Sequence, residues 1–372
     1  MSTPAVRARD LGLPFRGTPG PLNAITDVPG VLVGMTTIIA GYGPLEPGQG
    51  PVRTGVTAIL PRGRQKPLQG VWAGTFRFNG NGEMTGVHWI EDGGYFVGPV
   101  CLTNTHAVGV AHHAAVRWMI DTYPEEFQKH IWAMPVVAET YDGVLNDING
   151  QHLTPEHVLQ ALDRASGGPV LEGNHGGGTG MVAYGFKGGT GTASRQVSPS
   201  GIPGTVGVLV QANHGSREWL EIFGQRWVDR TAAPPVFEEE RGSIIVVIAT
   251  DLPLLPHQLK RVARRAALGI GRHGTVGGNS SGDLFLAFST ANPPPLPNRA
   301  NGLMNLAVLP DDASDPIYEA VVQGVEEAVL NAMTAAESMP SINPPGLVEA
   351  IPHHVLRDIA KRLTIREDAP TQ

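Results

Sequence analysis

Apolar residues along this chain fall into short runs separated by clusters of Gly, Pro, Asn and Ser. The runs at 54–61, 205–213 and 243–250 are rich in β-branched residues and are bounded by turn-forming residues. This pattern is typical of β-strands, and the unbroken apolar run at 243–250 is typical of a central strand. We therefore expect strands at these positions, and further strands at 71–76 and 134–142.

Other segments carry apolar residues at helical spacing, and they lie at 104–120, 154–165, 256–269, 315–338 and 352–363. Thr103 or Asn104 is expected to cap the first helix, because a short polar side chain can accept a hydrogen bond from the first turn. Pro155 suits the first turn of the second helix, since its missing N–H would be unpaired there in any case.

The first 34 residues are expected to contain an arm and two short strands. We expect residues 1–20 to form a loose arm. Residues 24–34 then predict a strand, a turn at Pro29 and Gly30, and a second strand.

The order of the elements predicts the fold class. Helices come in pairs between blocks of strands, without strict alternation of strand and helix. An α+β fold is therefore expected, in four layers of helix, sheet, sheet and helix (an αββα sandwich). We find no convincing repeat and no linker, so the 372 residues are expected to form a single domain.

Composition and charge narrow the classes of function. Hydrophobic residues make up 41% of the chain and charged residues 16%, which suits a globular core. The net charge of -7 makes nucleic acid an unexpected partner. The single cysteine, Cys101, excludes an internal disulfide and a cysteine-based zinc site. Residues 1–15 lack an unbroken apolar core and no apolar run reaches about 18 residues, so we expect a soluble cytoplasmic protein.

The stretch at 277–283 has the sequence Gly-Gly-Asn-Ser-Ser-Gly-Asp and leads into an apolar run. Two adjacent hydroxyls, on Ser280 and Ser281, lie where glycines permit a sharp bend. A strained peptide bond before a serine can rearrange by an N-to-O acyl shift and break. The new N-terminal serine would then carry a nucleophile and its own amine base. The residues alone are equally typical of a polar turn before a strand.

Residues 278–292, Gly-Asn-Ser-Ser-Gly-Asp-Leu-Phe-Leu-Ala-Phe-Ser-Thr-Ala-Asn, resemble the start of the β-subunit in the self-cleaving DmpA/BapA aminopeptidases, peptidase family S58. That family includes L-aminopeptidase/D-esterases and β-peptidyl aminopeptidases. Further motifs appear in the family's order at 25–34, 139–147 and 211–213, and the resemblance extends from residue 25 to about residue 331.

The resemblance implies that the chain cuts itself before the serine of the Ser-Gly-Asp triplet, which is Ser281. The products would be an α-subunit of residues 1–280 and a β-subunit of residues 281–372. Ser280 stands where the family often has Gly or Asn, so it remains the second choice for the new terminus. The resemblance also implies an αββα sandwich, no cofactor, and a homo-oligomer of αβ units.

Two candidate site residues lie at strand ends. The amide of Asn213 could donate to a developing oxyanion, although an asparagine that starts a turn is the commoner case. The Tyr141 hydroxyl could orient or protonate a reacting group, although a half-buried structural tyrosine is equally typical. The resemblance implies that Asn213 helps to form the oxyanion hole and that Tyr141 faces the nucleophile.

Two glutamates complete the candidate set. Glu139 could bind the free ammonium group of a substrate. Glu326 interrupts an apolar helix, where a solvent-facing glutamate would be the usual explanation. The resemblance implies that Glu326 belongs to a Ser-x-Glu pair that binds the nucleophile's amine. The serine of that pair is replaced here by Gly324, so one hydroxyl is missing.

Three other features are expected to be structural. The glycine-rich stretch at 173–180 lacks the lysine of a phosphate-binding loop. The pairs His112-His113 and His353-His354 are sequence neighbours, which point in different directions on a helix, so no metal site is expected. The basic residues at 260–265 are expected to form a solvated helix face.

Together these observations predict a self-processing serine aminopeptidase that acts on small peptides, amides or esters with a free amine. Two alternatives remain open. One is a related amidohydrolase that acts on non-peptide oligoamides through the same nucleophile. The other is a non-catalytic member of the family, which Gly324 in place of serine would favour.

Overall fold

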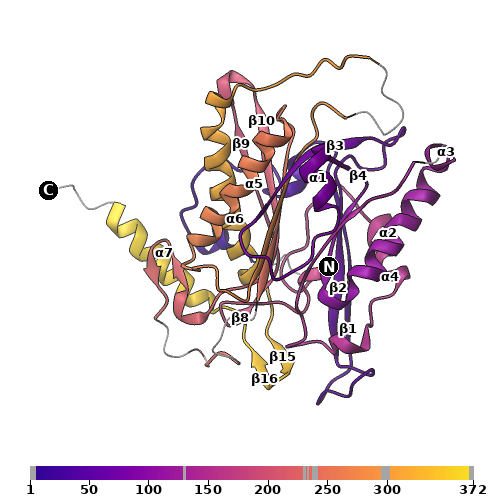
Figure 1. Ribbon diagram of the computed structural model, residues 1–372. Helices are drawn as coiled ribbons and strands as arrows, with labels where there is room; N and C mark the ends of the chain where they lie inside the picture. Colours follow the sequence, from indigo (N-terminus) through magenta and orange to yellow (C-terminus); the bar gives the residue numbers. More distant parts are fainter. Residues whose placement is uncertain are drawn as a thin grey trace.

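The computed structural model describes residues 6–128, 131–228, 232, 234–236, 242–294 and 302–367. Two large sheets lie face to face between two layers of helices (Figure 1). The predicted helix, sheet, sheet, helix order is therefore confirmed.

The first sheet has four strands in the order β1 (Leu32–Ala40), β2 (Val52–Leu60), β5 (Val100–Asn104) and β6 (Val136–Thr140). The second has six strands in the order β4 (Tyr95–Val97), β3 (Gly70–Arg77), β14 (Gly282–Ser289), β13 (Ser243–Thr250), β10 (Gly204–Asn213) and β9 (Gly189–Val197). Neighbouring strands are antiparallel except for the pairs β5 with β6 and β13 with β14, which are parallel.

Shorter elements complete the described part of the chain. The α-helices are α1 (Val87–Gly93), α2 (Val108–Thr122), α3 (Pro124–Phe127), α4 (Pro155–Asp163), α5 (Pro256–Gly271), α6 (Asp315–Thr334) and α7 (His353–Glu367). The small hairpins pair β7 (Val182–Ala183) with β8 (Phe186–Lys187), β11 (Glu221–Ile222) with β12 (Gln225–Arg226), and β15 (Met339–Ile342) with β16 (Pro345–Val348). Short 3-10 helices lie at Ala8–Leu11, Ile25–Asp27, Thr105–Ala107, Ile148–Gly150, Gly176–Gly178, Pro199–Gly201, Arg217–Trp219 and Asp311–Ala313.

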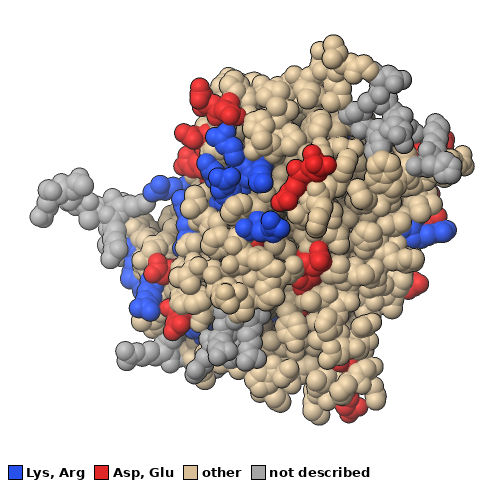
Figure 2. Space-filling model, in the orientation of Figure 1, with Lys and Arg blue, Asp and Glu red and all other residues tan. Residues whose placement is uncertain are grey.

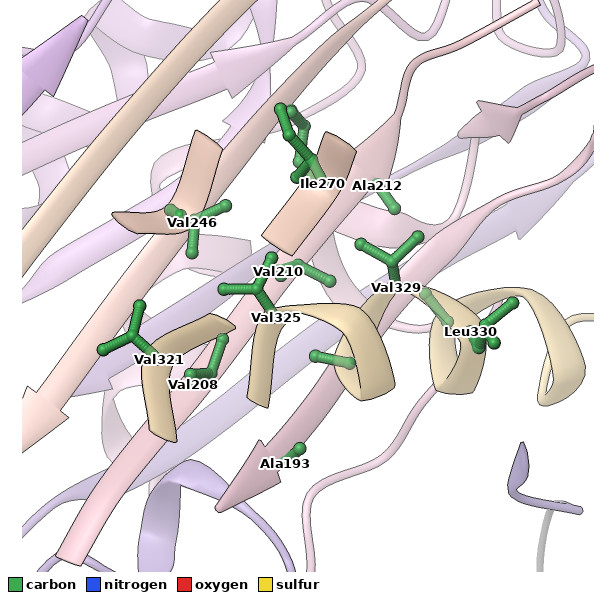
Figure 3. Close-up of a cluster of buried hydrophobic side chains, with 14 of the residues drawn as sticks. Ala193, Val208, Val210, Ala212, Val246, Ile270, Val321, Val325, Val329 and Leu330 are labelled. Carbon is green, nitrogen blue, oxygen red and sulfur yellow. The ribbon is translucent and has the colours of Figure 1, made fainter. Parts of the chain in front are cut away.

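Three apolar layers hold the four structural layers together. Helices α2 and α4 pack on the outer face of the four-stranded sheet, and residues such as Ile59 and Val247 fill the space between the sheets. On the other outer face, Val325 and Val329 of α6 pack against Val208 of β10 (Figure 3). Because β10, β13 and β14 are covered on both faces, their sequences are almost unbroken apolar runs.

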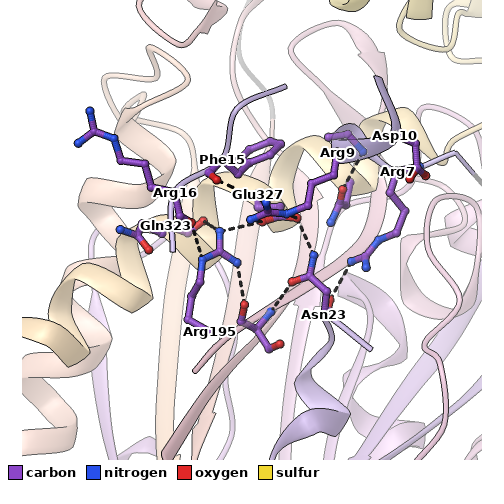
Figure 4. Close-up of polar contacts among 12 residues, drawn as sticks. Arg7, Arg9, Asp10, Phe15, Arg16, Asn23, Arg195, Gln323 and Glu327 are labelled. Atoms are coloured by element: carbon purple, nitrogen blue, oxygen red, sulfur yellow. Dashed lines mark hydrogen bonds and ion pairs between the residues drawn. The ribbon is translucent and has the colours of Figure 1, made fainter. Parts of the chain in front are cut away.

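The N-terminal arm is held firmly, so the prediction of a loose arm is wrong for residues 6–20; residues 1–5 lie outside the described part. Arg9 Nε lies 2.7 Å from Glu327 Oε1, and Arg195 Nη2 lies 2.7 Å from Glu327 Oε2 (Figure 4). Ala8 and Leu11 are buried in the core beside α6. A buried carboxylate shared by two arginines thus ties the arm to α6 and β9.

Two short 3-10 helices, Ile25–Asp27 and Thr105–Ala107, bear on predictions made from the sequence. The strand expected near residue 25 is wrong, because Ile25–Asp27 forms a 3-10 helix in which Asp27 accepts hydrogen bonds from the N–H groups of Leu22 and Ala24. Asn104 has a capping role, as expected, but it caps the 3-10 helix Thr105–Ala107 that leads into α2, since its side chain accepts from the N–H groups of His106 and Ala107.

Charged side chains of both signs lie over the α5 and α6 side of the molecule (Figure 2). Lys260 and Arg264 are exposed on α5, as expected of a solvated helix face. Arg261 Nη1 lies 3.0 Å from Asp311 Oδ2, so part of the positive charge is paired. The face seen in Figure 2 therefore has mixed charge.

Candidate active site

Ser281 lies directly before β14, in the middle of the six-stranded sheet. Its side chain is fully buried, whereas Ser280 is exposed. The Ser281 N–H donates to the carbonyl of Gly278 at 3.0 Å and closes a tight turn. Gly277 has a φ of 69°, and a side chain there would collide with Phe78. The glycine is therefore required by both the backbone conformation and the space available.

A loop at 78–83 holds this turn in place. The N–H of Phe78 donates to the carbonyl of Asp283 at 2.9 Å, and the N–H of Asp283 donates to the carbonyl of Asn79 at 3.1 Å. The Asn81 amide donates to the carbonyl of Ser280 at 2.6 Å. This carbonyl belongs to the peptide bond that self-cleavage would break.

Asp283 is the closest polar partner of the Ser281 hydroxyl. Ser281 Oγ donates to Asp283 Oδ1 at 2.6 Å, and Asn79 Nδ2 donates to Asp283 Oδ2 at 3.2 Å. Asp283 is only 2% exposed. Sequence reasoning used it as part of a motif and gave it no role, although its place two residues after Ser281 puts both side chains on one face of an extended chain.

Glu139 lies near the turn from the other sheet. Its Oε1 accepts from the N–H of Glu83 at 2.9 Å, and its Oε2 accepts from the Thr105 hydroxyl. A Cβ placed on Gly82 would lie 3.1 Å from Glu139 Oε1 and 3.6 Å from the Cα of Gly282. Burial raises the pKa of Glu139, and these two hydrogen bonds oppose the rise.

Asn213 and Tyr141 are brought together. Asn213 ends β10, and its Nδ2 donates to the main-chain carbonyl of Tyr141 at 3.0 Å. Its Oδ1 accepts from the N–H of Val182 at 2.8 Å, so the orientation of the amide is fixed. The second N–H of this amide has no partner among the described residues. Both side chains border a hollow of 10 Å³, which has room for about one water molecule.

The sheet register relates Asn213 to the turn. Asn213 pairs with Ser243 on β13, and Ser243 pairs with Gly282 on β14. Two strand spacings separate Asn213 from Gly282, which is about 10 Å. The candidate oxyanion donor and the candidate nucleophile therefore lie in one row at one end of the sheet, without direct contact.

Glu326 is paired with an arginine in the intact chain. Its Oε2 accepts from Arg272 Nη1 at 2.6 Å, and its main-chain carbonyl lies 2.8 Å from His273 Nε2. The amine of Ser281 that Glu326 is predicted to bind does not exist in the intact chain, where this nitrogen is a main-chain amide that donates to Gly278. The role of Glu326 toward such an amine stays a prediction.

Gly324 faces the six-stranded sheet, and a Cβ there would lie 3.0 Å from Val208 Cγ2. A serine at this position would press against Val208. The glycine at position 324, which lacks the serine hydroxyl, therefore allows α6 to pack tightly on β10.

His214 is a buried residue beside Asn213 that sequence reasoning did not single out. Burial lowers its pKa to about 3, and neither ring nitrogen has a hydrogen-bond partner among the described residues. The ring is therefore neutral at physiological pH.

A larger pocket opens next to the turn. It has a volume of 160 Å³ and is lined by Phe76, Gly82, Glu83, Val87, His88 and Leu284, among others. Its walls combine apolar side chains with the charged residues Arg77 of β3 and Glu83 of loop 78–83. A pocket of this kind can take a small apolar side chain.

The glycine-rich stretch 173–180 is buried, as expected of a structural element. A Cβ on Gly177 would lie 1.9 Å from Gln211 Oε1, so this segment fits closely between strands. Among the described residues, no group of three or more His, Cys, Asp or Glu side chains is arranged to hold a metal ion. No helix in the same part of the chain is long and apolar enough to cross a membrane.

Comparison with known proteins shows the family. The model of peptidase family S58 matches residues 23–344. The chain is 50% identical to the beta-peptidyl aminopeptidase BapA of Sphingosinicella microcystinivorans, over 96% of this chain and 92% of that protein. It is similar in structure to the L-aminopeptidase D-Ala-esterase/amidase of Ochrobactrum anthropi, with a TM-score of 0.89, 56% identity and coverage of 96% and 99% of the two chains. A beta-aminopeptidase of Burkholderia sp. matches with a TM-score of 0.85 and 41% identity, over 99% of this chain and 100% of the other.

The chain therefore belongs to peptidase family S58. It is an aminopeptidase-type hydrolase of peptide and amide bonds, as the sequence predicted.

Proposed function

We propose that this aminopeptidase is made as one chain and cuts itself before Ser281, to give an α-subunit of residues 1–280 and a β-subunit of residues 281–372. The observation that carries the proposal is the turn before β14. There a buried serine hydroxyl lies next to a peptide bond whose carbonyl is already hydrogen-bonded by Asn81.

After the cut, Ser281 would attack the first carbonyl of the substrate. Its own α-amine would take the proton, because such an amine has a reference pKa of about 7.7–8.0 and is partly unprotonated near neutral pH. The unused N–H of Asn213 would donate to the oxyanion, and the Tyr141 hydroxyl would help to orient the reacting group. Water would then release the acyl group from Ser281.

The substrate would be a small peptide, amide or ester with a free N-terminal amine. The Glu139 carboxylate lies beside Gly82, which also lies beside Gly282, and it would bind the ammonium group. The 160 Å³ pocket would take a small apolar side chain. The relatives are named as β-peptidyl and L-amino-acid peptidases, so β-peptides and L-amino-acid amides are the first substrates to test.

A denaturing gel with N-terminal sequencing tests the proposal. We expect two fragments, of roughly three-quarters and one-quarter of the mass, with Ser281 at the start of the smaller one. Ser281→Ala should stay uncut and inactive on amino-acid p-nitroanilides, whereas Ser280→Ala should be cut normally. A purified chain that stays intact and still hydrolyses these substrates would contradict the proposal.

The homo-oligomer expected from the family and the cytoplasmic location both stay predictions. The first is tested by the mass of the purified protein in solution, and the second by cell fractionation.

A further inference from the structure

We infer that Asp283 and Asn81 are catalytic residues of the self-cleavage step, an inference that rests on the proposed function. Asp283 would act as the base that takes the proton of the Ser281 hydroxyl. Asn81 would stabilise the oxyanion that forms on the Ser280 carbonyl.

A separate base is needed because the α-amine of Ser281 does not exist before the cut. In the intact chain this nitrogen is an amide whose N–H donates to Gly278. Glu326 is paired with Arg272, and Asn213 lies two strands away from Gly282. The groups proposed for peptide hydrolysis are therefore not placed to start the first cleavage.

Asp283 meets the requirements for this base. A carboxylate has no proton to donate, so the 2.6 Å contact runs from the Ser281 hydroxyl to Asp283 Oδ1. Both side chains are almost fully buried, where a charge-assisted hydrogen bond is strong. Asn79 Nδ2 holds the other oxygen of the carboxylate at 3.2 Å, which fixes its orientation.

Asn81 meets the requirements for the oxyanion donor. Its Nδ2 lies 2.6 Å from the Ser280 carbonyl oxygen, on which negative charge develops during attack. The Asn81 main chain also lies against Gly282, where a Cβ would come within 2.2 Å of the Asn81 carbonyl. The glycine that follows Ser281 therefore lets the donor loop approach the bond.

Self-cleavage would run through an ester that joins the Ser281 hydroxyl oxygen to the Ser280 carbonyl carbon. The Ser281 hydroxyl proton moves to Asp283 as Oγ bonds to the Ser280 carbonyl carbon, and the oxyanion accepts from Asn81. The bond between that carbon and the Ser281 nitrogen then breaks, and the nitrogen takes the proton from Asp283. Water hydrolyses the resulting ester, which leaves a carboxyl group on Ser280 and returns the hydroxyl to Ser281.

The test is a time course of cleavage of the full chain, made by cell-free synthesis and followed by denaturing gel and intact mass. We expect Asp283→Asn to slow cleavage about 10²- to 10⁴-fold, as for loss of a general base. Asn81→Ala should slow it about 10²- to 10³-fold, as for loss of an oxyanion donor. Asn81→Asp keeps the size of the side chain and removes the donor, so it should be as slow as Asn81→Ala.

Asn279→Ala is the matched control, because Asn279 lies in the same turn and its side chain makes no hydrogen bond among the described residues. It should be cut at the wild-type rate. A pH series separates a base from a structural residue: wild-type cleavage should slow in acid as the carboxylate is protonated, and Asp283→Asn should lose this dependence. Circular dichroism shows whether each variant is folded.

Cleavage of Asp283→Asn and Asn81→Ala at the rate of Asn279→Ala would overturn the inference and leave self-cleavage standing. If Asp283→Asn does not fold, the exposed Asn81 variants still test the oxyanion donor, and wild-type cleavage that does not slow in acid would overturn the role of Asp283 as the base. A wild-type chain that is never cut would instead overturn the proposed self-cleavage, and this inference with it.

Discussion

Asp142 follows Tyr141 after β6 and is fully buried. Asn146 Nδ2 donates to its Oδ1 at 3.0 Å, but its Oδ2 has no hydrogen-bond partner among the described residues. Burial raises the pKa of Asp142 from 3.8 to about 7, against the effect of hydrogen bonds that favour the charged form. The folded chain therefore keeps a proton here that the unfolded chain has already lost.

This proton makes stability depend on pH. Between about pH 4 and pH 7 the folded state binds more protons than the unfolded state, so the free energy of unfolding should fall as pH rises through this window. The difference between 3.8 and about 7 corresponds to about 4 kcal/mol. Asp142→Asn should remove this loss of stability. Its free energy of unfolding should therefore exceed that of the parent by a large amount at pH 8 and by a small amount at pH 4.

Urea unfolding at both pH values, in an uncut Ser281→Ala background, measures this difference. An Asp142→Asn variant whose free energy of unfolding differs from the parent by the same amount at pH 4 and pH 8 would contradict it.

Asn213 gives a second prediction at this scale. Asn213→Asp keeps an acceptor for the N–H of Val182 but removes both amide donors. We expect kcat on a p-nitroanilide substrate to fall about 10²- to 10³-fold. Asn174→Asp is a suitable control, because Asn174 is also bonded at both ends to main chain, at Glu337. Equal activities of the two variants would exclude an oxyanion role for Asn213.

The residues that sequence reasoning found and missed differ in a physical way. Ser281 and Asn213 stand next to long apolar runs, so their strand-end positions could be predicted locally. Asn81 acts on Ser280, 199 positions away in the sequence. Such a contact depends on the pairing of β3 with β14, which no local pattern reveals.

Among the elements, α6 lies unusually close to β9, and Gly191 makes this possible. A Cβ on Gly191 would lie 1.9 Å from the Ala328 carbonyl oxygen, a main-chain atom of α6 that cannot turn aside. We expect Gly191→Ala to destabilise the fold by at least about 1–3 kcal/mol, as overpacking does.

Gly271→Ala provides the comparison, since nothing lies within 4 Å of a Cβ placed on this last residue of α5. It should be neutral or slightly stabilising, by up to about 1 kcal/mol, because alanine favours a helix. Thermal unfolding of both variants measures the contrast, and similar melting temperatures would show that α6 can move away from β9.

Strands and helices were predicted well where the local sequence pattern reflects how the segment is buried or capped. The central strands read as apolar runs because both faces are covered, and α4 was marked by Thr154 and Pro155. The N-terminal arm was not predicted, because the Arg9 pairing depends on Glu327, 318 positions further along. Residues 217–228 form a 3-10 helix and the β11–β12 hairpin, which the sequence pattern did not predict.

At the scale of the whole molecule, the segment 303–308 exposes several apolar side chains to solvent. Leu303 is 101% exposed, and Met304, Leu306 and Val308 are also exposed. A run of this kind is typical of a contact between chains. It therefore supports the proposed homo-oligomer and gives a place to test it.

We expect the purified protein to have a solution mass that is a multiple of one αβ unit, by light scattering. Leu303→Asp with Leu306→Asp should lower this mass, because a buried unpaired charge opposes association. Replacing the exposed Leu268 of α5 by Asp is a control on another surface and should leave the mass unchanged. A single αβ unit in the unaltered protein would contradict the oligomer itself.

The position of β14 has a consequence for a cut chain. This strand is hydrogen-bonded on both sides, to β13 and to β3, so the smaller fragment would supply an inner strand of a sheet built mostly by the larger one. The fragments could not separate without breaking that sheet. Once denatured, however, the two fragments would have to find each other by diffusion, so refolding of one αβ unit should depend on concentration, whereas folding of one uncut chain should not. Processing would thus leave the fragments held together in the native protein but would make refolding after denaturation less efficient in dilute solution.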